Sequence, residues 1–191
     1  ALNLFRDYRV EDVFFQRQPR NNGAMSRIQG FPPVANASAH TLILGSMPGE
    51  ASLRAGRYYA HPRNAFWPIV SELLGITADA SYAVRTRALK SAGFALWDVL
   101  HSCHREGSLD AHIRAQSGIT NDFPKFLRSH RQITRICFNG AAAETMFTRR
   151  VLPRLEGNSI SLVRLPSTSP AHAALSFVEK MEAWRAILKR I

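Results

Sequence analysis

The alternation of strand-like and helix-like segments downstream of Thr41 limits the folds open to this chain more than any other feature. The first unit begins with the apolar run TLILGS at 41–46, continues through the turn MPGE, and ends in NAFWPIVSELLG at 64–75. In that last segment, apolar residues recur three or four positions apart until Gly75, which is typical of one face of a helix that ends at a glycine. We therefore predict a strand, a turn and a helix.

The same order repeats along the rest of the chain. Three more apolar runs have the composition of strands, namely 94–100, 133–140 and 159–166. Helical patterns occupy 81–92, 123–130 and 141–152. A last helix is predicted to bury one face made of Phe177, Met181, Trp184, Leu188 and Ile191. Strands that alternate with helices favour an α/β fold, a three-layer α/β/α sandwich around a central, mostly parallel sheet of four to five strands.

The length of 191 residues fits one globular domain with a substantial core. We expect this domain to span 25–191. Residues 1–24 are polar, carry charges of both signs and precede Met25. We expect them to form an N-terminal extension, either a tag or an upstream translated region.

The charge balance points to a polyanionic partner. The chain has 25 Lys and Arg residues against 14 Asp and Glu, for a net charge of +11. Such an excess suits nucleic acid, although a basic protein without such a partner remains an alternative at this point. No apolar run approaches the ~20 residues of a membrane span, and the first residues lack the apolar core of a signal peptide. We expect a cytoplasmic protein.

The two cysteines, Cys103 and Cys137, are too few for a disulfide framework or a four-thiolate metal site. The segment HSCH at 101–104 packs its histidines too closely for a usual zinc pattern. We therefore expect no metal and no cofactor.

Polar and glycine-rich segments follow each predicted strand. Ligands of parallel α/β sheets bind outside the carboxyl ends of the strands, so these segments are expected to meet at one rim. Gly45–Gly49 follows the first strand, and its backbone could approach a ligand closely. Asp98, Asn139 and Ser167 lie at or after the other three strands.

Two separated motifs carry a resemblance to a known family. The first is Gly45-x-x-Pro48-Gly49 followed by Tyr59 and by the segment HPRNAFW at 61–67, and the second is LPSTSPA at 165–171. Together with WDVLHSCHREGSLD at 97–110, they resemble the hypoxanthine-DNA glycosylase branch of the uracil-DNA glycosylase superfamily. The resemblance covers roughly residue 30 to the end of the chain.

One position departs from the mismatch-specific uracil and thymine glycosylases of that superfamily. Those relatives have an asparagine in the turn that orients the attacking water, whereas this chain has Met47. A thioether is a weak hydrogen-bond acceptor and cannot polarise water. In the branch that this chain resembles, the catalytic asparagine belongs to the H-P-x-N segment, which implies Asn64.

The resemblance also implies roles for the other motif residues. Tyr59 is expected to stack on a flipped base. The implied base-binding set is Gly45, Ser46, Met47, Pro48, Gly49, Tyr59, His61 and Asp98. The implied DNA-binding set is Ser167, Thr168, Ser169, Pro170, Ala171 and His172, in which the hydroxyls would contact phosphates and His172 is a candidate for filling the gap left by the base.

Structural roles remain open for several of these residues. Asn64 directly precedes the predicted helix and could be its N-cap. Asp98, Asp110 and Asp122 could activate water, but caps, turns and surface charges are the alternative, with Asp98 the strongest catalytic candidate. Tyr58, beside Tyr59, is expected in the core.

The resemblance implies a monofunctional DNA glycosylase that hydrolyses the N-glycosidic bond of a deaminated base, with hypoxanthine as the expected substrate, and leaves an abasic site. Neither motif contains a lysine that could form a Schiff base, which agrees with hydrolysis. The expected partner is double-stranded DNA, or also single-stranded DNA, bound by a monomer. Uracil or mismatch removal and a non-catalytic DNA-binding module are the alternatives.

Overall fold

The computed structural model describes residues 27–114, 116–155 and 159–188. The expected extension 1–24 and Ile191 lie outside these residues.

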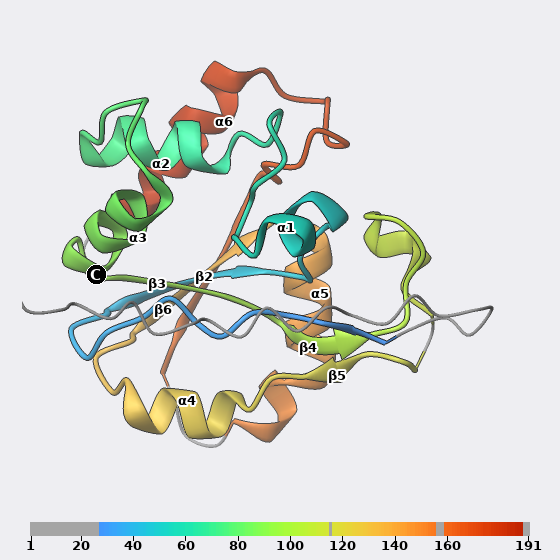
Figure 1. The fold of residues 1–191 in the computed structure, drawn as a ribbon. Helices are drawn as coiled ribbons and strands as arrows, with labels where there is room; N and C mark the ends of the chain where they lie inside the picture. Colours follow the sequence, from blue (N-terminus) through green and yellow to red (C-terminus); the bar gives the residue numbers. More distant parts are fainter. Residues whose placement is uncertain (1–26, 115, 156–158, 189–191) are drawn as a thin grey trace, which may run out of the picture.

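Four parallel strands form the central sheet, in the order β3-β2-β6-β7 (Figure 1). Their bounds are Thr41–Gly45 for β2, Phe94–Asp98 for β3, Arg135–Asn139 for β6 and Ser161–Leu165 for β7. Every residue of β2 and β3 is buried, as expected of parallel strands whose two faces are both covered. The predicted three-layer α/β fold with a mostly parallel sheet is confirmed.

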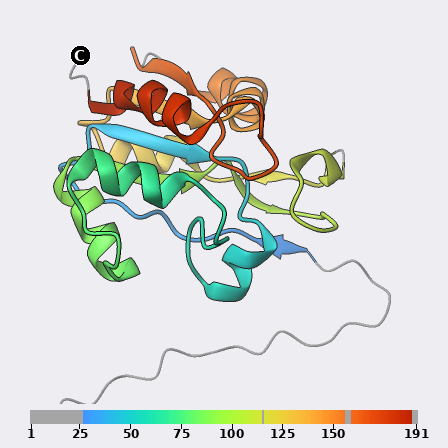
Figure 2. The same ribbon diagram turned by 90° about the horizontal axis from the view of Figure 1, so that it is seen from above.

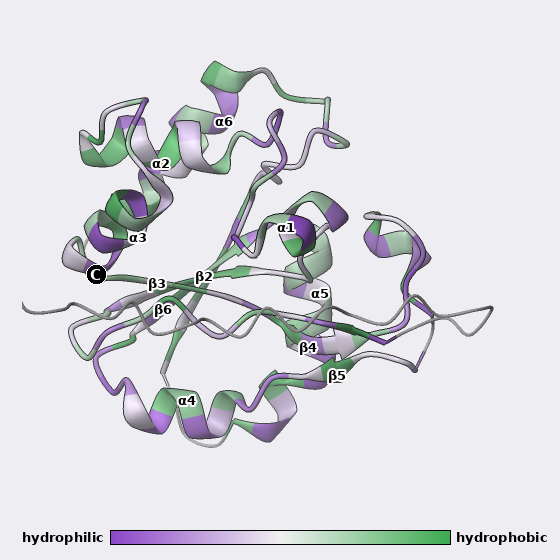
Figure 3. Cartoon of the chain, viewed as in Figure 1, coloured by the Kyte–Doolittle hydropathy of each residue, from purple (hydrophilic) through white to green (hydrophobic). Residues whose placement is uncertain are grey.

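Helices pack on both faces of this sheet, and apolar residues line the central strands between them (Figures 1 and 3). On one face lie α2 (Phe66–Leu74), α3 (Tyr82–Ser91) and α6 (Phe177–Trp184), which Figure 2 shows from above. The rings of Phe66 and Trp184 meet edge to face at 5.7 Å. On the other face, Phe123 of α4 (Phe123–Ser129) meets Phe147 of α5 (Ala141–Arg150) at 5.2 Å.

Local signals explain where several helices begin and end. Gly75 ends α2 with a φ of 64°, a left-handed conformation that glycine adopts at low cost. The side chain of Asp122 accepts a hydrogen bond from the Lys125 backbone N–H and caps α4, so the cap interpretation of this aspartate is confirmed. Ser176 and Glu179 form a reciprocal capping box at the start of α6.

The predicted apolar face of the last helix is partly wrong. Trp184 is fully buried, but Phe177 and Leu188 are 45% and 44% exposed. The α-helix ends at Trp184 and continues as a 3-10 helix, η3 (Arg185–Leu188). A 3-10 helix has fewer residues per turn, and Ile187 takes the buried position in place of Leu188.

A second, smaller sheet was not predicted from the sequence. Its antiparallel strands run in the order β1-β4-β5, with bounds Ile28–Gln29, Leu100–Cys103 and Ile119–Thr120. Strands of two to four residues are too short to show a periodic pattern. The connection between β4 and β5 contains the 3-10 helix η1 (Asp110–His112). This connection lies beside the carboxyl end of β2, because Ser46 bonds to Asp110.

Candidate active site

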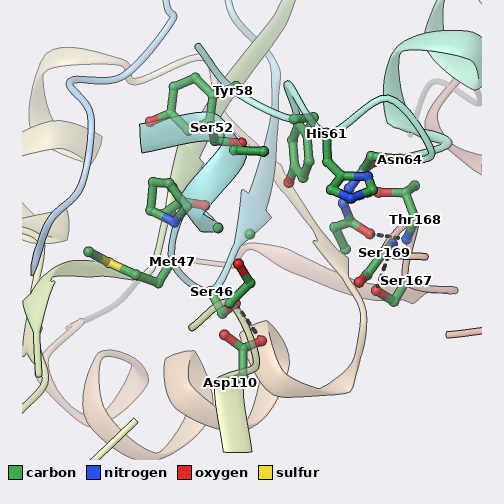
Figure 4. A pocket seen from close by; sticks show the side chains of 18 of the residues that line it. Ser46, Met47, Ser52, Tyr58, His61, Asn64, Asp110, Ser167, Thr168 and Ser169 are labelled. Carbon is green, nitrogen blue, oxygen red and sulfur yellow. Dashed lines mark hydrogen bonds between the residues drawn. The ribbon is translucent and has the colours of Figure 1, made fainter. Parts of the chain in front are cut away.

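A cavity of about 160 Å³ lies at the carboxyl ends of the central strands (Figure 4). It brings together thirteen of the residues that the sequence implied as a site: Gly45, Ser46, Met47, Pro48, Gly49, Tyr59, His61, Asn64, Asp98, Ser167, Thr168, Ser169 and Pro170. Ala171 and His172 do not line this cavity but an adjoining hollow, together with Leu109 and Gly140.

Six further lining residues were not assigned to the site from the sequence: Ala51, Ser52, Tyr58, Ser108, Asp110 and Asn139. Tyr58 was expected in the core, and it is 3% exposed. Asn139 is the last residue of β6, and the sequence placed it at the rim without giving it a role in the site. Asp110, which the sequence left open as a residue that could activate water, begins η1 and reaches the cavity through its contact with Ser46.

Gly45 is where the chain must pass closely between two polar side chains. A Cβ at this position would collide with Asp98 Oδ1 and lie 2.9 Å from the Tyr59 hydroxyl oxygen. Only a residue without a side chain fits there, so the first glycine of the turn is explained by this close packing.

Met47 lies in the turn, but its side chain is directed away from the centre of the cavity (Figure 4). It is 6% exposed and packs with Leu100 and Cys103 in a small apolar cluster. The thioether therefore contributes packing, and the turn carries no side chain at this position that could hold water.

Tyr59 has an unusual backbone conformation, with a φ of 54°. One face of its ring stacks on Phe66 at 4.0 Å between ring centroids. Its hydroxyl is buried and has no hydrogen-bond partner in the described part of the chain. The Asn139 amide, which also bonds to Thr168, lies close enough to this hydroxyl to lower its pKa, but no hydrogen bond of standard geometry joins the two. Burial, together with the nearby Asp98, raises the pKa of Tyr59.

Asn64 lies two residues before Phe66, the first residue of α2, and is separated from it by the N-cap Ala65. Its Oδ1 accepts a hydrogen bond of 2.9 Å from the Phe66 backbone N–H in an Asx turn, so Asn64 braces the start of α2 without being the N-cap that the sequence left open. Since a backbone N–H needs an oxygen acceptor, this bond fixes the orientation of the amide. The Nδ2 group then makes no hydrogen bond within the described residues, and Asn64 lines the cavity.

Asn139 and Thr168 form a closed pair of hydrogen bonds. The Asn139 Nδ2 group donates to Thr168 Oγ1, and Asn139 Oδ1 accepts from the Thr168 backbone N–H, both at 2.8 Å. The Thr168 carbonyl accepts from the Ala65 N–H at 3.0 Å and so joins this loop to the start of α2. Thr168 is 1% exposed and its hydroxyl oxygen accepts from Asn139, so the implied contact of this hydroxyl with a phosphate stays a prediction.

Ser167 and Ser169 differ from Thr168 because they are partly exposed. Their hydroxyl oxygens accept hydrogen bonds of 3.2 Å from the N–H groups of Ser169 and Ala171, which leaves both hydroxyl protons free to be donated. The helix α6 supports this loop, because Trp184 donates to the Pro166 carbonyl and the buried Lys180 donates to the His172 carbonyl. We refer to Asn64, Asn139 and Ser167–Pro170 as the amide wall of the cavity.

A second group of lining residues consists of Ser46, Asp98 and Asp110, supported by Arg105, and we call it the carboxylate wall. Asp98 is 3% exposed, and its Oδ2 has no hydrogen-bond partner in the described part of the chain. Burial, with a further contribution from Asp110, raises the pKa of Asp98 to about 8, and the positive charge of Arg105 opposes this shift. Asp98 is therefore largely protonated at neutral pH.

Asp110 has a different environment from Asp98. Its Oδ2 accepts a hydrogen bond of 2.7 Å from the Ser46 hydroxyl. The guanidinium of Arg105 lies 3.9 Å from the other carboxylate oxygen. Burial raises the pKa of Asp110, whereas the bond from Ser46 and the charge of Arg105 lower it. The pKa of Asp110 is still raised overall, as is that of Asp98, but Asp110 differs in having a hydroxyl donor and a guanidinium beside its oxygens.

Metal-ligand groups and membrane-spanning helices were searched for among the described residues. Within 27–114, 116–155 and 159–188, no three His, Cys, Asp or Glu side chains are grouped so that they could hold a metal ion. No helix in the same part of the chain combines the length and apolar character needed to cross a membrane.

Comparisons with known proteins identify the relatives of this chain. The family model of the uracil DNA glycosylase superfamily matches residues 32–188. A protein of Methanosarcina acetivorans named hypoxanthine DNA glycosylase is 34% identical over 162 residues, which are 84% of this chain and 98% of the relative. A protein of the same name from Methanosarcina barkeri is 37% identical over 113 residues, which are 59% of this chain and 70% of the relative.

A solved structure resembles the fold as well. The solution NMR structure of a candidate uracil DNA glycosylase from Methanosarcina acetivorans superposes with a TM-score of 0.69 at 32% identity. The match covers 86% of this chain and all of the other. Since the family model spans most of the chain and a relative above 30% identity is matched over nearly its whole length, the chain belongs to the uracil DNA glycosylase superfamily.

Proposed function

We propose that this protein is a monofunctional DNA glycosylase that removes hypoxanthine from deoxyinosine in DNA and leaves an abasic site. The observation that carries the proposal is the cavity at the carboxyl ends of the strands, in which Asp98 Oδ2 and the Tyr59 hydroxyl are buried without hydrogen-bond partners among the described residues. Buried polar groups are rarely left unpaired, so these two groups are expected to bind a ligand. The names of the Methanosarcina relatives support hypoxanthine as that ligand.

The chemistry of the cavity suits a deaminated base. Deamination replaces an exocyclic amino group with a carbonyl oxygen and adds a ring N–H beside it. A protonated Asp98 can donate to that carbonyl through its O–H and accept from the ring N–H through its other oxygen. The Nδ2 group of Asn64 is a further donor, and Tyr59, already stacked on Phe66, supplies an aromatic platform.

The reaction is expected to be hydrolysis. Breaking the glycosidic bond creates positive charge on the sugar and negative charge on the departing base, so donors aimed at the base lower the barrier. No lysine is among the cavity-lining residues of the described chain, and the ammonium of Lys180 donates to the His172 carbonyl. A Schiff-base step therefore has no nucleophile there.

DNA binding would use the rim of the amide wall and the net positive charge of the chain. Ser167 and Ser169 have hydroxyl protons to donate to phosphates, and Pro170, Ala171 and His172 continue the same loop. The net charge of +11 favours a polyanion and predicts affinity that falls with salt concentration. We propose a monomer that acts on double-stranded DNA in the cytoplasm without a cofactor.

Single-turnover cleavage of duplexes that carry hypoxanthine, uracil, xanthine or thymine tests this function, with wild type beside Asn64→Ala and Asn64→Asp. Asn64→Asp keeps an oxygen for the Phe66 N–H and loses the amide donor. Loss of one such donor costs about 100- to 1,000-fold in rate. We expect both variants to lose that much activity on hypoxanthine while their affinity for DNA changes little.

Asn36→Ala, which removes an amide outside the cavity that bonds to the Lys90 carbonyl, is the control. Cleavage mainly at uracil by the wild type would identify the other substrate of the superfamily. Intact DNA binding without cleavage of any base would indicate a non-catalytic module.

A further inference from the structure

The site as assigned so far lacks a group that can take a proton from water. Asn64 Oδ1 is occupied by the Phe66 N–H, and the remaining Nδ2 group is a donor. His61 Nδ1 accepts from the Arg63 N–H at 3.1 Å, so a neutral imidazole carries its proton on Nε2 and is also a donor toward the cavity. The Met47 thioether packs in the apolar cluster.

The hydroxyls of the lining serines are poor proton acceptors and are already used. Ser52 and Ser108 accept from the backbone N–H groups of Ala60 and Glu50, and Ser46 donates to Asp110. Among the described lining residues, the carboxyl groups of Asp98 and Asp110 are therefore the candidates for a base.

The two carboxyl groups differ in a way that selects Asp110. Asp98 is almost fully buried, and its Oδ1 is packed against the backbone of Gly45, where it is suited to the base-binding role proposed above. The Asp110 side chain is 31% exposed, so water can reach it, and it has a cationic neighbour in Arg105. Figure 4 shows Ser46 and Asp110 on one side of the cavity and His61 and Asn64 on another.

The position of Asp110 is fixed from the turn that follows β2. Ser46 and Asp110 are 64 residues apart in sequence and joined by the 2.7 Å hydrogen bond. The Arg105 side chain is fully buried, donates to the carbonyls of Pro48 and Gly107, and lies beside Asp110. The connection between β4 and β5 thus places the Asp110 carboxylate beside the turn after β2. In that turn, the Met47 side chain cannot hold water.

We propose that Asp110 is the catalytic carboxylate that orients and deprotonates the attacking water, and that Ser46 and Arg105 are its positioning residues. This inference rests on the proposed glycosylase function. As the bond from the base nitrogen to C1′ breaks, its electron pair leaves with the base, and the water oxygen bonds to C1′. The water proton passes to Asp110, which later returns it to solvent, and the departing base takes up one proton from solvent.

The pH dependence of the rate is part of this proposal. The ionisable groups that interact electrostatically with Asp110 are Asp98, Arg105, Tyr59 and Cys103. Because burial raises the pKa of Asp110, its carboxylate is lost as the pH falls through that raised pKa. The single-turnover rate of wild type is expected to decrease on the acid side with one ionisation, and Asp110→Asn is expected to lack that decrease.

The test compares wild type, Asp110→Asn, Ser46→Ala and the control Asp122→Asn in single-turnover assays on hypoxanthine-containing duplex from pH 5 to pH 9. A general base contributes about 100- to 10,000-fold, so Asp110→Asn should be at least about 100-fold slower at pH 7 with little change in DNA affinity. Ser46→Ala keeps the carboxylate and should lose roughly tenfold. Asp122→Asn keeps a cap for α4 and should match wild type.

Formate provides a second measurement on Asp110→Ala, because a small carboxylate can enter the space left by the side chain. A partial recovery of rate with formate supports a catalytic carboxylate, and an unfolded variant is recognised by its circular dichroism. The inference is overturned if Asp110→Asn stays within threefold of wild type and keeps the acid decrease, or if formate leaves a folded Asp110→Ala inactive. A wild type that cleaves no base at all would instead refute the proposed function.

Discussion

The two walls of the cavity satisfy their polar groups in opposite ways. In the amide wall, Asn139 and Thr168 close a pair of hydrogen bonds, and the loop at Ser167–Pro170 is tied to α2 and α6. In the carboxylate wall, Asp98 Oδ2 has no hydrogen-bond partner among the described residues, and two carboxyl groups share one buried arginine. A paired network stabilises a fold, whereas an unpaired buried group costs free energy until a ligand binds it.

This difference suggests that the amide wall has a structural role and the carboxylate wall a chemical one. The amide wall holds its side chains in place by bonds within the protein and gives the rim a fixed shape. The carboxylate wall keeps proton-binding groups available and is expected to lower the free energy of unfolding. Substitutions in the two walls should therefore change stability in opposite directions.

Asp98→Asn is expected to have the largest effect on stability. The unfolded chain releases the Asp98 proton near pH 4, whereas the folded protein holds it up to about pH 8. The free energy of unfolding of wild type should fall as pH rises through this window, by on the order of several kcal/mol. Asp98→Asn cannot ionise, so it should be more stable than wild type at pH 8 and less active.

Urea denaturation at pH 5 and pH 8 measures this effect, with Asp122→Asn as the aspartate control outside the cavity. Parallel pH dependences for wild type and Asp98→Asn would contradict the assignment of a costly carboxylate wall.

Gly45→Ala tests the close packing of Asp98 in the carboxylate wall against the turn and Tyr59. The added methyl group collides with Asp98 Oδ1 and crowds the Tyr59 hydroxyl, so both side chains must shift. A misplacement of about 1 Å can cost ~100-fold in rate, and we expect a loss of that size in the single-turnover rate. Gly49→Ala, whose Cβ would meet Ser108 at an ordinary 3.4 Å, should cost much less. Equal rates for the two variants would mean that the spacing at Gly45 is unimportant.

Asn139→Ala should have the smallest of the three effects and the opposite sign from Asp98→Asn. It removes two hydrogen bonds and leaves the backbone N–H of the buried Thr168 unpaired, which costs about 2 kcal/mol. Asn139→Asp keeps an oxygen for that N–H and should lose less. Urea denaturation at pH 7 measures both, and an unchanged midpoint for Asn139→Ala would show that the amide wall does not support the loop.

The parts of this molecule that follow local patterns were predictable from the sequence. The strands β2 and β3 are fully buried, largely apolar runs, and Asp98 was placed at the cavity because it ends β3. The bond of Asn64 to the backbone at the start of α2 also joins near neighbours, although the N-cap itself is Ala65.

The remaining features depend on contacts between distant segments. Asp110 enters the site through Ser46, 64 residues away, and the short strands of the second sheet carry no periodic signal. The burial of Lys180 was not predicted, because its ammonium group is held by the His172 carbonyl, a contact that the helical pattern does not indicate. Thr168 shares the composition of its neighbours, and only the fold turns its hydroxyl inward.

The support that α6 gives to the His172 loop has a consequence for how the site is assembled. A chain made from its N-terminus completes the four central strands before α6 emerges, and α6 supplies Trp184 and Lys180 to that loop. The sheet and both carboxyl groups can thus be in place while the rim is still unsupported. We therefore expect the site to become able to bind a nucleotide only in the last step of folding, when α6 packs against the loop.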